Sequence, residues 1–368
     1  MNATATTAGA ALAELVTGDP ALPGLALVLD DERRSAAFGE TTTIERVRYK
    51  PRASIVAAIR TADGRRWWCA SYSDVRKLCK SAERSEKHDA ELRRLSDLCL
   101  AGALHGDRLL ASRIRGVFDD ASELNGARVL RYNPLRRVVV RVGDRAVKVS
   151  ADDAVPLAAR RLAALGTGVL PPEQVGAGAW AYEWWGAGDA SEPALATADV
   201  LTAAGASLAR IHGASIADLP MLDAAAQASQ ATKAIGALLP ALRPRAARLA
   251  AAVAELRGPA VPSHGDWSPD QILTDGTDVR IIDLDRATLA PREHDLGSYL
   301  AAGGDPVLLD GYIGAGGRID RRALASWTAF GILRRATEPF RTGDPAWPHR
   351  IEHALERAER ISREGEQC

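Results

Sequence analysis

The feature that most constrains the fold of this chain is a set of polar residues between positions 264 and 285. The tripeptide His-Gly-Asp at 264–266 is followed, five residues after its aspartate, by the amide Gln271. An Asp-Gly turn signal at 275–276 then separates two apolar stretches, and the second of them leads to Asp283 and Asp285. Asp-Gly between apolar runs is a strong hairpin signal. We therefore expect a hairpin that brings these polar groups to the same end of two neighbouring strands.

The order of these groups matches what phosphoryl transfer requires. In protein kinases H-R-D-x-x-x-x-N is followed by D-F-G, and here H-G-D-x-x-x-x-Q is followed by D-L-D. One carboxylate must orient the acceptor hydroxyl and accept its proton, and Asp266 fits that role. A second carboxylate and an amide oxygen must hold Mg2+, which prefers oxygen ligands and keeps several waters. Asp283 and Gln271 fit this second role.

The tripeptide alone is a weak signal, because His105-Gly106-Asp107 is a second copy of it. The fifth residue after Asp107 is Ser112 rather than an amide, and no D-x-D follows on a strand. We predict that 105–107 is a helix end or a turn. Only the 264–285 cluster combines the tripeptide, the amide, the hairpin and the paired aspartates.

The first half of the chain is predicted to contain two Arg-rich hairpins. One covers 44–73 around an Asp-Gly turn at 63–64, and the other covers 127–150 around a Gly-Asp turn at 143–144. Before them, the apolar run at 25–29 is typical of a strand.

The two hairpins resemble each other in sequence. Val-Arg-Tyr-Lys-Pro at 47–51 aligns with Leu-Arg-Tyr-Asn-Pro at 130–134. This similarity indicates either an internal duplication or a chance likeness between Arg-rich hairpins. Only the second hairpin carries a lysine on its return strand, Lys148, whereas the first has Trp67 and Trp68 in that region.

Helical periodicity dominates much of the remaining chain. The segments with apolar residues at helical spacing are 74–115, 153–165, 194–214 and 232–257, together with the C-terminal tail. A mostly helical half therefore follows a smaller half that contains strands, which predicts an α+β protein.

From about residue 125 to the end, the chain resembles the aminoglycoside phosphotransferase family, also called choline-kinase-like. The resemblance rests on the 264–285 cluster, on Lys148 in Ala-Val-Lys-Val, and on the segments 208–212 and 294–301. It implies a bilobal protein-kinase-like fold, use of ATP and Mg2+, and phosphorylation of a hydroxyl group on a small molecule. Gln271, where the family usually has Asn, resembles the maltokinase and glucosamine-kinase branch, as does an extra N-terminal cap.

The resemblance also implies an organisation into three parts and a set of site residues. We expect a cap subdomain at 1–124, a nucleotide-binding N-lobe at 125–188 and a helical C-lobe at 189–368. In the catalytic loop Asp266 is the expected base and His264 braces it. Metal ligation falls to Gln271 and Asp283, with Asp285 as a secondary support, and Asp295 stabilises a loop nearby. Lys148 is expected on the nucleotide phosphates.

Three further positions, and the phosphate-binding turn, are interpreted from the chemistry of their side chains. The turn at 133–137 is not glycine-rich, so Arg136 or Arg137 would have to hold phosphates by direct charge. The acceptor pocket is expected to contain Trp267, Glu293 and Glu338, because an aromatic face packs on a sugar ring and carboxylates pair with amines. A sugar or amino sugar is the first acceptor expected, and an aminoglycoside antibiotic the second.

Composition excludes some classes of function. Lys plus Arg and Asp plus Glu both total 47, which argues against nucleic-acid binding driven by charge. No apolar run is long enough for a membrane span, and the four cysteines lack metal-type spacing, so we expect a cytoplasmic protein. The resemblance to the maltokinase and glucosamine-kinase branch implies a role in carbohydrate metabolism. The alternative hypothesis is a catalytically inactive, nucleotide-binding regulatory protein of the same fold, which the unusual phosphate turn favours.

Overall fold

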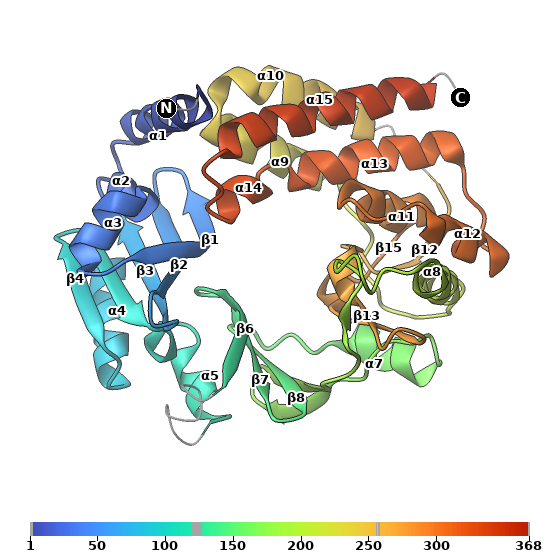
Figure 1. The fold of residues 1–368 in the computed structure, drawn as a ribbon, viewed down its shortest axis with the longest axis horizontal. Coiled ribbons are helices and arrows are strands. Elements are labelled where there is room, and N and C mark those ends of the chain that lie inside the picture. The colour runs from blue at the N-terminus through green and yellow to red at the C-terminus, as the bar shows by residue number, and fades with distance from the viewer. Residues whose placement is uncertain (1–2, 119–126, 255, 257, 367–368) are drawn as a thin grey trace. The chain divides into compact units, whose positions relative to one another are not determined.

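The computed structural model describes residues 3–118, 127–254, 256 and 258–366 (Figure 1), and it separates into two compact units. The first unit comprises Met1–Val155, Glu173–Glu183 and Glu338–His349; the second comprises Pro156–Pro172, Trp184–Thr337 and Arg350–Cys368. The expected boundary between 124 and 125 lies outside the described residues. Among the described residues, no helix has both the length and the apolar character that crossing a bilayer requires.

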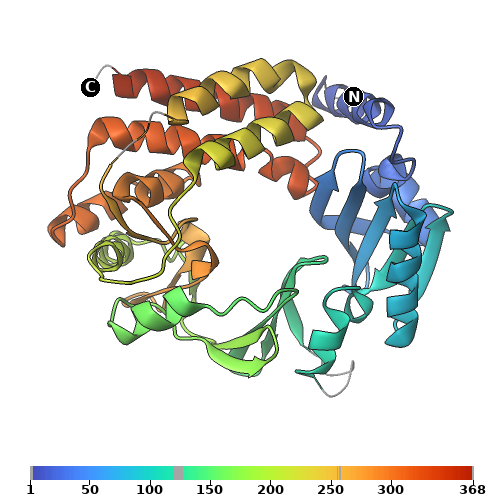
Figure 2. The same cartoon turned by 180° about the vertical axis from the view of Figure 1, so that it is seen from behind.

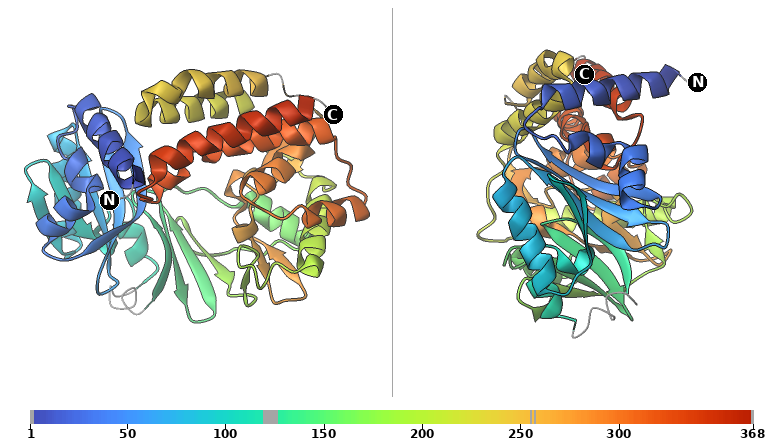
Figure 3. Two further views of the ribbon diagram at one scale, coloured as in Figure 1. Left: turned by 45° about the horizontal axis from the view of Figure 1, so that its top comes forward. Right: turned by 90° about the vertical axis from the view of Figure 1, so that its left-hand side faces the viewer.

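The first unit contains two five-stranded antiparallel sheets with the same topology. The first sheet has the order β1-β2-β3-β5-β4, and the second has the order β6-β7-β8-β10-β9. Figure 3 shows the strands of the first sheet in blue to cyan and those of the second in green. The strands of the first are β1 (Thr42–Lys50), β2 (Ser54–Thr61), β3 (Arg66–Tyr72), β4 (Leu92–Ser96) and β5 (Cys99–Ala103). Those of the second are β6 (Arg128–Asn133), β7 (Arg137–Val142), β8 (Arg145–Ser150), β9 (Glu173–Gly176) and β10 (Ala179–Glu183). Both predicted hairpins are confirmed.

Strand register identifies which residue of the first sheet takes the place of the lysine. Lys148 pairs with Val139 on one side and Trp180 on the other. In the first sheet, Ala70 is the residue between Val56 and Leu100. Val56 precedes Val139 by the same number of residues that separates the two matching pentapeptides. The counterpart of the lysine is therefore an alanine.

A matching side-chain contact fixes the first turn of each sheet. In the second sheet the buried Asp107 carboxylate accepts hydrogen bonds from the Tyr132 hydroxyl and from the backbone N–H of Leu135, both at 2.8 Å. In the first sheet, the Asp19 carboxylate likewise accepts hydrogen bonds from the Tyr49 hydroxyl and from the backbone N–H of Arg52, both at 2.7 Å. Leu135 has φ 60° and Arg52 has φ 61°, an uncommon conformation for such residues. Shared topology, register and turn geometry favour an internal duplication over chance.

Two predictions of secondary structure in this unit are wrong. Residues 25–29 form helix α2 (Leu25–Leu29) rather than a strand, because Leu25 and Val28 turn the same way into the core. A short apolar run cannot distinguish the two by periodicity. The predicted helix at 74–115 is helical over α4 (Val75–Lys87) and again over α5 (Ala111–Arg115), and the hairpin β4–β5 lies between. Strand β5 is almost entirely buried against β3, and this pairing outweighs helical spacing.

The remaining helices of the first unit are short, apart from the one nearest the N-terminus. They are α1 (Ala3–Gly18), α3 (Asp31–Phe38) and α14 (Glu338–Arg341). Asp30 caps α3 by accepting a hydrogen bond from the Arg33 N–H, and Gly39 ends that helix in the left-handed conformation.

The second unit is mostly helical, as expected, and holds two small sheets. Its helices are α7 (Leu157–Ala164), α8 (Ala198–His212), α9 (Ala224–Leu238), α10 (Arg243–Ala254), α11 (Arg292–Ala301), α12 (Val307–Gly314), α13 (Arg321–Arg335) and α15 (Trp347–Glu366), the last from Arg350 onwards. One sheet has the order β11-β13-β14, with strands Gly188–Asp189, Ile272–Thr274 and Val279–Ile281. The other pairs β12 (Ala260–Ser263) with β15 (Thr288–Pro291). Helices α9 and α10 lie side by side (Figure 2).

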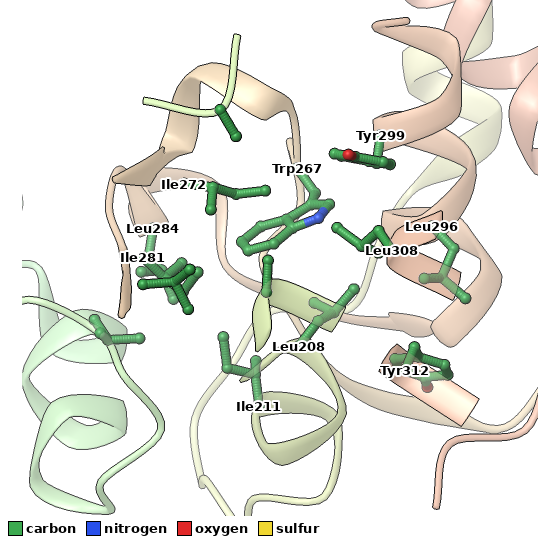
Figure 4. Close-up of a cluster of buried hydrophobic side chains, with 14 of the residues drawn as sticks. Leu208, Ile211, Trp267, Ile272, Ile281, Leu284, Leu296, Tyr299, Leu308 and Tyr312 are labelled. Atoms are coloured by element: carbon green, nitrogen blue, oxygen red, sulfur yellow. The ribbon is translucent and has the colours of Figure 1, made fainter. Parts of the chain in front are cut away.

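In the second unit, a hydrophobic cluster packs residues of the sheet β11-β13-β14 against the helices. Trp267 is fully buried, and it lies between Ile272 and Ile281 of the sheet and Leu208 and Leu296 of the helices (Figure 4). The loop that carries the His-Gly-Asp tripeptide is thus anchored by its own tryptophan. The predicted hairpin around 275–276 is confirmed, since Ile272 pairs with Ile281 and Thr274 with Val279.

Candidate active site

The loop between β12 and β13 carries the tripeptide at 264–266, and His264 connects it to the end of β14. The buried His264 Nε2 donates a hydrogen bond to the backbone carbonyl of Ile282 at 2.9 Å. Ile282 precedes Asp283, so this bond ties the loop of Asp266 to the residue expected to bind metal. This hydrogen bond is of the kind that the expected bracing role of His264 requires, and the role itself stays a prediction.

Asp295, near the start of α11, holds the same loop from the other side. Its carboxylate accepts hydrogen bonds from the backbone N–H groups of His264 at 2.6 Å and Gly265 at 2.9 Å. His212 Nε2 donates a third at 3.2 Å. Burial acts to raise the pKa of Asp295, but the hydrogen bond and charge of His212 help to hold that pKa well below its usual range.

Position 265 accepts only glycine. Gly265 has φ +85°, and a Cβ atom there would lie 1.9 Å from the carbonyl oxygen of Arg286. The loop therefore passes directly against the segment that follows Asp283. This close approach is why the small residue stands between His264 and Asp266.

Gln271 and Asp283 are brought together by the hairpin. The N–H of Ile282 donates to the backbone carbonyl of Gln271 at 3.1 Å. Gln271 is buried, and no described residue donates a hydrogen bond to its Oε1 atom. Asp283 adopts the left-handed conformation, with φ 63° and ψ 45°, which is uncommon outside glycine and concentrates at functional sites.

The buried Gln271 amide oxygen, which has no hydrogen-bond donor among the described residues, and the carboxylate of Asp283 at the end of the paired strand fit the needs of a Mg2+ site. A buried polar atom without a partner is costly unless a ligand satisfies it. Mg2+ takes oxygen ligands from one or two side chains and completes its shell with water and phosphate. Asp285 is exposed in the 3₁₀ turn Leu284–Arg286 that follows.

Three arginines surround the Asp266 carboxylate, and the sequence-based reasoning missed all of them. Arg334 and Arg335 each place Nη2 3.3 Å from Oδ1, and Arg286 places Nη1 3.4 Å from Oδ2. Arg334 is 11% exposed, Arg335 30% and Arg286 58%. Burial is the main reason that the pKa of Arg334 falls to about 10.

The arginines of α13 reach Asp266 because α13 crosses α11 at very short range. A Cβ atom on Gly297 of α11 would lie 2.6 Å from the carbonyl carbon of Trp327, and one on Gly331 of α13 would lie 2.7 Å from the Ala301 Cβ. Glycines on both helices therefore permit the crossing. Arg334 and Arg335 lie almost 70 residues from Asp266 in sequence, and no local pattern marks them.

The remaining predicted residues are distributed over both units. Three of them belong to the first unit: Lys148 is buried in β8, Arg137 begins β7, and Arg136 lies in the turn before β7. Glu338 also belongs to the first unit and pairs there with Arg46 and Arg341.

Two residues of the second unit that were predicted to bind the acceptor are buried in the fold. Trp267 is 0% exposed in the hydrophobic cluster, so its ring offers no face to a sugar. Glu293 is buried, and its carboxylate accepts a hydrogen bond from the N–H of Asp320 at 3.2 Å. Neither residue enters the acceptor site proposed below.

Comparison with known proteins gives a consistent result. The family model described as "Phosphotransferase enzyme family" matches residues 124–327, which is more than half of the chain. By sequence, no curated protein matches. The structure of APH(2″)-IIIa with GDP and kanamycin is similar with a TM-score of 0.50 and 18% identity, and covers 68% of this chain and 98% of that one.

A second solved structure that this chain resembles is that of a choline/ethanolamine kinase family protein from Mesorhizobium loti. It is 17% identical, covers 63% of this chain and 87% of that one, and has a TM-score of 0.49. The likeness to APH(2″)-IIIa confirms the α+β, protein-kinase-like fold that the sequence predicts.

Proposed function

The chain belongs to the phosphotransferase enzyme family, and we propose that it moves the γ-phosphate of ATP to a hydroxyl group of a sugar, an amino sugar or an aminoglycoside. The observation that carries this proposal is the buried Gln271 Oε1, without a hydrogen-bond donor among the described residues, beside Asp283. The segment that joins them to the loop of Asp266 is Ile282, whose N–H bonds to Gln271 and whose carbonyl accepts a hydrogen bond from His264. Because Gln271 stands where the family usually has Asn, membership of the maltokinase and glucosamine-kinase branch stays a hypothesis.

In the proposed reaction Asp266 accepts the proton of the acceptor hydroxyl. The hydroxyl oxygen forms a bond to the γ-phosphorus while the bond from that phosphorus to the bridging oxygen breaks, so ADP is released and the proton passes from Asp266 to water. Mg2+ held by Gln271 and Asp283 would neutralise charge on the phosphates. His264 and Asp295 keep the loop rigid, which places the base before the acceptor arrives.

We also propose that the second sheet of the first unit, within 125–188, is the nucleotide-binding lobe, with Lys148 on the phosphates. The first sheet, within 1–124, would be a cap that descends from the same lobe and no longer binds nucleotide. The replacement of the lysine by Ala70 supports this division.

One observation favours the alternative of an inactive regulatory protein. The N–H of Leu135, in the turn at 133–137, already donates to Asp107 and is not offered to a phosphate. Such a protein would bind nucleotide without consuming it.

The test combines nucleotide binding with product analysis. Calorimetry of ATP with and without Mg2+ should show metal-dependent binding in the wild type and its loss in Asp283→Ala and Gln271→Leu, whereas the exposed Asp278→Ala keeps it. Mass spectrometry should detect the gain of one phosphate on an acceptor from the panel. Metal-dependent binding without transfer to any acceptor would favour the regulatory protein, and metal-independent binding would contradict the Mg2+ site.

A further inference from the structure

We propose that the acceptor carries a carboxylate or phosphate group close to the hydroxyl that is phosphorylated, and that Arg335 and Arg286, with Arg334 behind them, recognise this anionic group. The inference rests on the proposed function, since Asp266 is taken as the group that binds the hydroxyl. It changes the expected substrate class from amino sugars to sugar acids, sugar phosphates or related hydroxy acids.

The first argument is a surplus of positive charge. Across the described part of the second unit, Asp266 is the only carboxylate paired with these three guanidinium groups. The other hydrogen-bond contacts of Arg334 and Arg335 are His294 Nε2 at 3.2 Å and Ser298 Oγ at 3.5 Å, and neither belongs to a carboxylate. Asp295 is near, but its oxygens already accept hydrogen bonds from His264, Gly265 and His212. Even with the charge of Asp295 counted, two negative charges face three positive ones.

The second argument is the burial of Arg334. A guanidinium that is 11% exposed has lost much of its hydration, and the fold must compensate that cost. The glycines Gly297 and Gly331 allow the close helix crossing that brings it to Asp266. A charge that only served solubility would need neither burial nor a specialised crossing. An anion bound beside Asp266 would supply the missing counter-charge.

The third argument is geometry. A guanidinium presents several N–H donors in a planar fork that matches carboxylate and phosphate oxygens. Arg335 and Arg286 contact Asp266 through single nitrogens and are partly exposed, so their remaining donors can reach a ligand. Because they lie 3.3–3.4 Å from the carboxylate, the anionic group and the hydroxyl must be near neighbours on the acceptor.

The same arrangement disfavours cationic acceptors. An ammonium group beside Asp266 would meet three like charges at close range, which is repulsive. The carboxylates expected to bind amines do not offset this, because Glu293 is buried against α13 and Glu338 pairs with Arg46 in the first unit.

The experiment compares acceptors that differ in one group. With Mg2+ and ATP, kcat/KM is measured for glucose, glucosamine, glucuronate, gluconate and glucose 6-phosphate, and each acceptor is also titrated calorimetrically. A charge-assisted hydrogen bond contributes roughly tenfold to a hundredfold in affinity, so at least one anionic acceptor should exceed glucose by that factor. The carboxylates and the phosphate ester distinguish the two anion types. Equal use of glucose and every acid, or preference for glucosamine, would overturn the proposal.

Variants locate the effect at the arginines. Arg335→Gln and Arg286→Gln should raise KM for the anionic acceptor about tenfold or more and leave KM for ATP unchanged, and Arg335→Lys should recover part of the loss. Arg321→Gln, an exposed arginine at the other end of α13, is the matched control and should have no effect. Arg334 is not used, because its burial makes a folding defect the expected result.

Two outcomes separate this inference from the proposed function. If the arginine variants lower kcat equally for neutral and anionic acceptors, the arginines serve the transferring phosphate or Asp266, and the anion site is wrong while the kinase survives. If no acceptor is phosphorylated, calorimetry still decides: binding of the acid that Arg335→Gln abolishes supports the anion site, and no binding overturns it.

Discussion

The tripeptide His-Gly-Asp occurs twice in this chain, and the two copies have different surroundings. Asp107 is fully buried and accepts hydrogen bonds from the Tyr132 hydroxyl and the Leu135 N–H, while burial raises its pKa. Asp266 is 28% exposed, and its side-chain partners among the described residues are three guanidinium groups, two of them from α13. A carboxylate whose oxygens are taken up by a turn stabilises structure, whereas one that stays accessible can bind a hydroxyl. The surroundings, and not the tripeptide, determine the role.

The sharpest contrast between the copies should be in turnover. Asp266→Asn keeps the size of the side chain but removes the proton acceptor, so kcat should fall by about 10²–10⁴-fold. The melting temperature should fall as well, because Asp266 pairs with the buried Arg334, so kcat is measured well below the melting temperature of the variant. Asp107→Asn, the matched control, should keep a kcat close to wild type. Near-normal turnover of Asp266→Asn would remove the basis for calling it the catalytic base.

Substitution of the central glycines should separate the copies by stability. Gly265→Ala combines φ +85° with a backbone oxygen at 1.9 Å, so we expect a loss of about 3 kcal/mol or more in unfolding free energy, with loss of activity. Gly106 has no positive φ, and its nearest neighbours are the side chains of Ala90 and Ser85 at 2.4 and 2.8 Å. Gly106→Ala should therefore cost less, about 1–3 kcal/mol. Urea titration measures both, and a reversed order would contradict the comparison.

Removal of the Asp107 carboxylate should cost stability and spare catalysis. Asp107→Ala leaves a buried Tyr132 hydroxyl and the Leu135 N–H without a hydrogen-bond acceptor, which should lower the unfolding free energy by about 2–4 kcal/mol. Asp19→Ala in the first sheet is the matched variant and should cost a similar amount. A negligible effect of both on chemical denaturation would show that these turns do not depend on the contact.

The smallest expected effect concerns pH. Burial lowers the pKa of His105 below its ordinary value of about 6.5, so below that pH the unfolded chain takes up a proton more readily than the folded one. The contribution of neutral His105 is thus fully present above about pH 6.5 and is lost as the pH falls, by less than about 1.4 kcal/mol per pH unit. The unfolding free energy, measured by urea titration, should differ less between pH 7.5 and pH 5.5 in His105→Gln than in the wild type. An unchanged difference would show that His105 does not contribute.

Sequence reasoning succeeded where partners are close along the chain. The hairpin between Gln271 and Asp283 follows from a turn signal between two apolar stretches, and the structure confirms it. It failed where pairing is remote: β5 pairs with β3, some thirty residues earlier, and this overrides the helical spacing of 92–100. Strand register likewise shows that Ala70, rather than Trp67 or Trp68, takes the place of Lys148.

By itself, the sequence determined the phosphotransferase class, the kinase-like fold and the local order of His264, Asp266, Gln271 and Asp283, because a short loop and a hairpin bring these residues together with little help from elsewhere. Only the tertiary structure decided what surrounds the Asp266 carboxylate. Arg334 and Arg335 arrive there through a glycine-lined helix crossing, and such packing leaves no periodic trace in either segment. The charge around Asp266 therefore could not be predicted from a chain whose acidic and basic residues are equal in number.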